Sequence, residues 1–372
     1  MIARDNPAVR RFAGQLGALL TVAALPVLAQ NPASQIRAEI GRLQRSIQER
    51  PLSGPDFPDA NSGVQQDLKA AADALNAGRI YLSVESVERA AEFLFAVRSY
   101  VERKAEIAKG GLPAFESLWG KESVDLTALE REYQAANWSG LPAAIQALAE
   151  VAETKTGPLL DGSRGFAAAN GLEDGLYYLG EAEGEAGFAR FCASLAMPRK
   201  AAPFPLRSFR AELQRLQTKT NAAFQPPRSI DLHARFIELN ATLKLAQESD
   251  AAKLYAGALY EYLEATLDYG MLDAAPLDAG EQAALKKDLA AAHKKLRAAK
   301  DDHSLAQMFL ERADSQTARA DGSSPSADDW RSARIIVDQV LPAYFAAQTP
   351  ASPLPQVAGK TVNITLVRWP YT

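Results

Sequence analysis

Hydrophobic residues recur at helical spacing along most of the chain. Ile36, Ile40, Leu43 and Ile47 follow one another at steps of four, three and four, which places them on one face of a helix. Comparable patterns predict helices over 64–77, 80–109, 141–155, 172–197, 206–224, 229–247, 250–269, 280–300, 303–313 and 326–347. The sequence therefore predicts an all-α protein of about twelve helices arranged in hairpins.

Glycine and proline mark the expected ends of these helices. Gly78 should end the helix over 64–77, and Gly110-Gly111 should end the long apolar helix that follows. We expect two short helices over 112–136 with a break at Gly120, and a loop at 161–163. Three prolines in 198–205 predict a linker between an N-terminal half, 30–197, and a C-terminal half, 206–347.

The two halves share short segments in the same order. These segments suggest an internal duplication into two similar halves, and coincidence between alanine-rich amphipathic helices is the alternative. The matched pairs are 37–44 with 210–217 (Arg-Ala-Glu-aliphatic-x-Arg-Leu-Gln), 77–85 with 256–264 (Ala-Gly-x-aliphatic-Tyr-x-x-aliphatic-Glu), and 161–163 with 321–323 (Asp-Gly-Ser).

The C-terminal tail, 348–372, has a different pattern. Val362, Ile364 and Leu366 alternate with polar residues, which predicts a short strand in an otherwise extended segment. An unpaired strand can complete the sheet of a partner through main-chain hydrogen bonds, so these residues and Trp369 are the candidate partner-binding residues. The alternative is that Trp369 and its neighbours pack back on the helices.

The first 29 residues resemble an export signal. Arg4, Arg10 and Arg11 precede an apolar run over 12–25, and Val27-Leu28-Ala29 offers small residues where signal peptidase cuts. We expect cleavage before Gln30 and a periplasmic or secreted protein that is not an integral membrane protein afterwards. A retained N-terminal anchor is the alternative.

Composition narrows the possible partners. Of 372 residues, 47% are hydrophobic and 23% are charged, and the formal charge of -4 does not favour nucleic acid. Cys192 is the one cysteine, so no intramolecular disulfide can form, and its apolar neighbours predict a buried thiol.

Few residues suggest catalytic or metal chemistry. The three histidines, His233, His293 and His303, lack the spacing of a metal-binding pair, and no phosphate-binding or nucleophile motif is present. We therefore expect no metal and no cofactor, and we assign no catalytic residue.

Two polar groups are candidate ligand sites. Tyr255, Tyr262 and Tyr269 are seven residues apart and share a helix face; with Glu261 and Glu264 they are candidates for a groove that stacks a sugar or a peptide. The alternative is a packing face with hydroxyls that reach water. A second group could collect cations or form a solvated acidic face: Glu173, Asp174, Glu181, Glu183 and Glu185.

Taken together, these features favour an exported helical interaction or scaffold protein without catalytic activity, whose partner is another envelope protein. The alternative is a carbohydrate-binding protein or carbohydrate-active enzyme that uses the tyrosine and glutamate face.

Overall fold

The computed structural model describes residues 31–349 except 53, 55, 137, 198–200, 225–231 and 320–321. The described residues form helices joined by short connections, which confirms the all-α prediction. The predicted signal segment 1–29 and the tail residues Val362, Ile364, Leu366 and Trp369 lie outside the described residues. No helix formed by the described residues combines the length and the apolar character needed to cross a bilayer.

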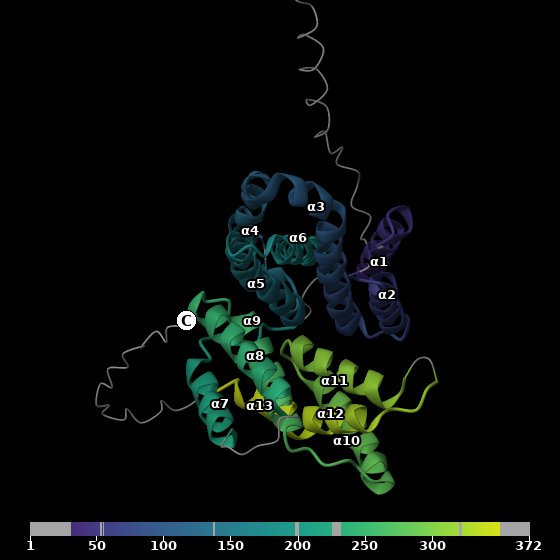
Figure 1. The fold of residues 1–372 in the computed structure, drawn as a ribbon. Coiled ribbons are helices and arrows are strands. Elements are labelled where there is room, and N and C mark those ends of the chain that lie inside the picture. Colours follow the sequence, from purple (N-terminus) through teal and green to yellow (C-terminus); the bar gives the residue numbers. More distant parts are fainter. Residues whose placement is uncertain are drawn as a thin grey trace, which may run out of the picture.

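The helices form two groups that lie one above the other in Figure 1. The N-terminal half contains α1 (Pro32–Glu49), α2 (Ala60–Asn76), α3 (Ile80–Thr127), α4 (Leu129–Ala135), α5 (Ala143–Ala168) and α6 (Leu172–Ser194). The C-terminal half contains α7 (Arg210–Ala223), α8 (His233–Ala251), α9 (Tyr255–Met271), α10 (Ala279–Ala298), α11 (Ser304–Thr317), α12 (Ala327–Ile335), the π-helical turn η3 (Ile336–Val340) and α13 (Leu341–Ala346). A short 3-10 turn, η1 (Trp138–Gly140), precedes α5.

The first helix that the structure describes forms as its pattern predicts. Ile36, Ile40, Leu43 and Ile47 are the buried residues of α1, and the Asn31 side chain accepts a hydrogen bond from the Ala33 N–H at its start. Gly78 has a φ of +75° between α2 and α3, a left-handed conformation that glycine adopts without steric cost.

One predicted break is present and two are not. Gly111 has a φ of +61° and ψ of -155°, so the first helical segment of α3 ends there and a second segment begins at once across a kink. The helix then passes through Gly120 to Thr127. The predicted loop 161–163 lies inside α5, where the buried Ser163 hydroxyl donates to the Leu160 carbonyl at 2.7 Å.

α6 packs very closely against α3. A Cβ atom added to Gly180 would lie 2.3 Å from the Phe95 carbonyl oxygen, and one added to Gly184 would lie 2.9 Å from the Glu92 Cα. Glycine is therefore needed at both positions for α6 to lie this near to α3. The close packing also brings the polar side chains of α6 next to those of α3.

The start of each half's central helix is capped by a glutamate from the other half. The Leu82 N–H, third in α3, donates to Glu311 Oε2 of α11 at 3.0 Å. The Gly257 N–H, third in α9, donates to Glu150 Oε2 of α5 at 2.8 Å. We call these two contacts the reciprocal caps.

Each capping glutamate also accepts a hydrogen bond from a glutamine of its own helix, and Glu150 Oε1 accepts a further one from the Tyr133 hydroxyl at 2.6 Å. Gln146 Nε2 donates to Glu150 Oε1 at 2.8 Å, and Gln307 Nε2 donates to Glu311 Oε1 at 3.4 Å. Each cap therefore comes from a Gln-x-x-x-Glu sequence on a helix that follows the capped helix of its own half. Burial raises the pKa of both glutamates, to about 7 for Glu311.

The connection between the halves is packed into the structure. Residues 198–200 of the predicted linker lie outside the described residues, whereas Phe204 is buried and its ring stacks on Tyr344 with centroids 4.8 Å apart. The Asp302 N–H donates to the Ala202 carbonyl at 2.7 Å. Apolar residues of both halves belong to one continuous core.

Candidate functional site

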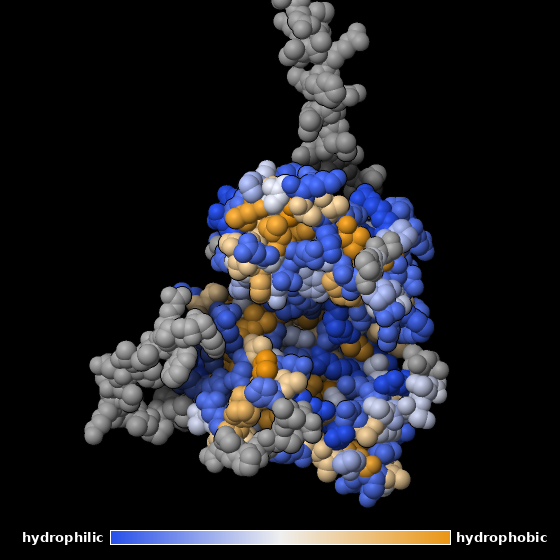
Figure 2. All heavy atoms as spheres, in the orientation of Figure 1, coloured by the Kyte–Doolittle hydropathy of each residue, from blue (hydrophilic) through white to orange (hydrophobic). Residues whose placement is uncertain are grey.

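Charged side chains gather where the two halves meet, around a cavity of about 210 Å³. We call it the acidic cavity because six carboxylates line it: Glu85, Glu88 and Glu92 of α3, and Glu261, Glu264 and Asp268 of α9. The space-filling view shows a hollow between the halves where hydrophilic residues predominate (Figure 2).

The two triads of carboxylates arise from the same spacing. In both α3 and α9 the acidic residues stand at positions i, i+3 and i+7, which places them on one face of the helix. α5 adds Lys155 and Val151 to the cavity wall, and α8 adds Thr242. The site thus requires both halves of the chain.

The ammonium group of Lys155 supplies the positive charge beside the carboxylates of α3. Its Nζ donates to Glu185 Oε1 of α6 at 2.7 Å and to Glu88 Oε1 at 3.3 Å, and it lies 3.7 Å from Glu92 Oε2. Burial alone lowers the pKa of Lys155, but the surrounding glutamates outweigh burial and raise it well above its usual value. Lys155 is therefore an ammonium ion held by carboxylates.

Arg312 of α11 binds one carboxylate from each triad. Its guanidinium makes a two-pronged contact with Glu264, at 2.8 Å and 2.5 Å, and donates to Glu85 Oε1 at 2.5 Å. Arg89 also reaches Glu85 Oε1, at 3.2 Å, and its side chain is 47% exposed, so the cavity wall meets the surface there.

Several of the carboxylates are held in surroundings that favour the protonated form. Burial raises the pKa of Glu88 to about 8 and that of Glu185 to about 7, although Lys155 opposes the shift in both. Burial also raises the pKa of Asp268 to about 6, with a further contribution from Glu264.

The predicted acidic group on α6 divides between the interior and the surface. Glu185 is fully buried beside Lys155, and burial together with Glu92 raises the pKa of Glu181 to about 8. Glu183 binds Arg103 at 2.9 Å, whereas Glu173 lies near Lys104 at 3.1 Å with a side chain that is 54% exposed. Asp174 is exposed.

Glu261 differs from the other carboxylates of the cavity. It is only 6% exposed, yet no hydrogen bond or ion pair joins its carboxyl group to any other residue that the structure describes. Burial raises the pKa of Glu261 well above its usual value, and the charges of Glu264 and Glu88 act in the same direction against Lys155. The carboxyl oxygens of Glu261 are not among the fully enclosed polar atoms that lack a partner, so they retain contact with the space of the cavity.

The predicted tyrosine and glutamate face is divided between two sides of α9. Glu261 and Glu264 both line the acidic cavity, whereas Tyr255, Tyr262 and Tyr269 are half-buried against the core and do not line it. Helical geometry explains this, because Tyr262 and Tyr269 lie about half a turn away from Glu264. Sequence analysis identified the two glutamates but not the residues that face them.

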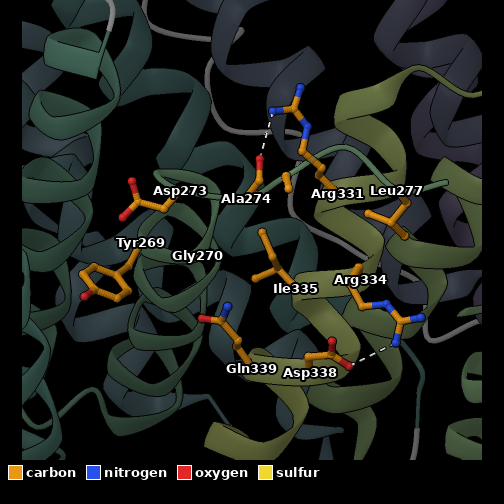
Figure 3. A pocket seen from close by; sticks show the side chains of 11 residues that line it. Tyr269, Gly270, Asp273, Ala274, Leu277, Arg331, Arg334, Ile335, Asp338 and Gln339 are labelled. Atoms are coloured by element: carbon orange, nitrogen blue, oxygen red, sulfur yellow. Dashed lines mark hydrogen bonds and ion pairs between the residues drawn. The ribbon is translucent and has the colours of Figure 1, made fainter. Parts of the chain in front are cut away.

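Tyr269 lines a second cavity, of about 310 Å³, between α9 and the α12–η3 segment. Figure 3 shows its ring extending away from Arg331 and Arg334, which lie on the other side. Both arginines have partners: Arg331 donates to the Ala274 carbonyl at 3.3 Å, and Arg334 donates to Asp288 and Asp338. This cavity thus offers no unpartnered charge comparable to Glu261.

The remaining candidate groups are engaged in structural contacts. His293 Nε2 lies 2.7 Å from Asp314, and His303 Nδ1 lies 2.9 Å from the Tyr344 hydroxyl. Cys192 is buried, and burial raises the pKa of its thiol well above the usual value. Within the described part of the chain, no three histidine, cysteine or carboxylate side chains are grouped so as to hold a metal ion.

Comparison with models of known protein families gives no match, and no curated protein or solved structure matches the chain.

Proposed function

We propose that the protein is an exported binding protein that holds a positively charged ligand in the acidic cavity and acts without catalysis. One observation carries the proposal: Glu261 is a buried carboxyl group that lines the cavity and has no hydrogen-bonding partner among the described residues. A bound cation would supply that partner.

The balance of charge around the cavity supports a cationic ligand. Six carboxylates line it, and the cations that reach it are Arg89, Lys155 and Arg312. Each of these cations is already bound to a glutamate. The cavity therefore holds more carboxyl groups than cations, and a bound cation would favour the ionised form of the carboxyl groups whose pKa burial raises.

The cavity lies between the two halves, so a ligand bound in it contacts both of them. Its walls come from α3 and α5 on one side and from α8 and α9 on the other. A ligand that touches both triads stabilises the folded chain, because it binds the native structure and not the unfolded one. A binding role needs no reactive group beyond these walls.

Export rests on the N-terminal segment 1–29 and not on the helical structure. We expect the protein purified from its native cell to begin at Gln30 and to be found outside the cytoplasm. N-terminal sequencing after cell fractionation checks this expectation, and an intact Met1 terminus would contradict cleavage.

Thermal unfolding in the presence of charged probes tests the binding proposal. Organic ammonium ions and divalent cations should raise the midpoint temperature of unfolding of the mature chain by about 3 °C or more at millimolar concentration. The anions acetate and phosphate, at equal ionic strength, should leave that midpoint unchanged. The Glu261→Gln variant should lose the response, and an equal response in wild type and variant would refute the site.

A further inference from the structure

We infer that the occupant of the acidic cavity is a small aliphatic primary amine, whose ammonium group donates hydrogen bonds to Glu261 and its neighbours on α9. The inference rests on the proposed function, because it names the chemical class of the cation that the cavity binds. It follows from the shape of the cavity, the composition of its walls and the way in which the protein already holds an ammonium group nearby.

Lys155 shows what the surrounding structure does with a primary ammonium group. Its Nζ is held by Glu185 at 2.7 Å and Glu88 at 3.3 Å, and its aliphatic stem comes from α5. The α9 triad repeats the spacing of the α3 triad across the cavity, and in it Glu261 has no donor. A second ammonium group would donate a hydrogen bond to Glu261, as the ammonium group of Lys155 does to Glu88.

The walls of the cavity suit a short carbon chain attached to that ammonium group. Val151 and Tyr260, which are 1% and 8% exposed, line the cavity beside the carboxylates. An aliphatic stem can pack on both, and the tyrosine ring also attracts a cation placed over its face. A volume of about 210 Å³ is far larger than a bare metal ion needs and accommodates several carbon atoms.

Calorimetric titration with 1,4-diaminobutane tests the inference. The mature wild-type chain should bind it, and 1,4-butanediol of the same length should give no heat, because it lacks the charge. Tetramethylammonium carries the charge without N–H donors and should bind at least about tenfold more weakly than the diamine. Equal binding of the two cations would refute the inference that the bound ammonium group donates hydrogen bonds to the carboxylates.

Two variants test whether the diamine binds in the acidic cavity or on the protein surface. Glu261→Gln should weaken diamine binding by about tenfold or more, because glutamine has nearly the same shape but cannot ionise beside a bound ammonium group. Glu106→Gln makes the same substitution at an exposed position on α3 and should leave binding unchanged. Equal effects of the two variants would show that the diamine binds the surface and would overturn the inference.

Titration with Mg²⁺, Ca²⁺ and Mn²⁺ separates this inference from the proposed function. If a divalent ion binds in a Glu261-dependent manner and the diamine does not, a cation site exists but its ligand is not an amine. If neither class of cation binds, both the inference and the proposed function fail.

Discussion

Replacing Glu261 with glutamine should stabilise the ligand-free protein, and the gain should grow with pH. The native carboxyl is buried without a partner, so its pKa is raised above the ordinary value of 4.5. Below that value both native and unfolded chains hold the proton. Above it the unfolded chain releases the proton while the native chain retains it, so wild-type stability falls as pH rises toward the native pKa.

The size of the effect follows from the proton balance. Each pH unit in which only the native chain holds the proton costs the wild type about 1.4 kcal/mol, and the glutamine variant avoids this cost. We therefore expect a gain of about 1 kcal/mol near pH 5.5 that grows as pH rises toward the native pKa of Glu261 and levels off above it. The other carboxyl groups with raised pKa values are present in both proteins, so their contribution cancels in the difference.

Urea unfolding at a series of pH values measures this difference. Glu264→Gln is the matched control on the same helix, and it should destabilise the protein because it leaves the buried Arg312 with one partner fewer. A Glu261→Gln difference that stays flat with pH, or that is destabilising near pH 7.5, would refute the argument, since it would mean that the native carboxylate is ionised and bound.

Two further predictions concern the helical framework. Glu150→Ala and Glu311→Ala should each lower the free energy of unfolding by about 2 kcal/mol in urea titrations, because each leaves a buried helix N–H without its acceptor; losses near zero would show that the reciprocal caps are replaced by water. Gly180→Ala should lower the free energy of unfolding by about 2 kcal/mol, because the added methyl group overlaps with α3. Gly187→Ala on the same helix meets no atom within 4 Å and should raise the free energy of unfolding by about 1 kcal/mol. Equal effects of the two substitutions would contradict the close packing of α6 on α3.

Local patterns predicted most of the helices and some of their ends. The apolar stripe of α1 and the turn at Gly78 are as expected, because burial of one face and a left-handed glycine both leave a direct mark on the sequence. Gly111 shows the limit of this approach. A glycine marks where a helix can bend, but whether the helix resumes depends on what the next residues pack against, and Phe115 is fully buried beyond the kink.

The candidate site could be predicted only in part. Glu261 and Glu264 were identified from the sequence, but the tyrosines grouped with them lie on another side of α9 and do not line the cavity. The spacing of Glu85, Glu88 and Glu92 was present in the sequence as a clue to a second acidic face. Lys155 and Arg312 could not be assigned to the site, because their glutamate partners on other helices come together only through tertiary packing.

The reciprocal caps give the two halves the relation of subunits in a symmetric dimer. In a two-fold interface, a residue of one subunit contacts a site on the other, and the equivalent contact is made in return. Glu311 of α11 caps α3, and Glu150 of α5 caps α9 in return, so the same rule is followed within one chain. The covalent connection keeps the two halves at a high local concentration, so dilution cannot separate them. Neither half expressed alone would retain a capped central helix, whereas the two halves supplied as separate chains could restore both caps by pairing.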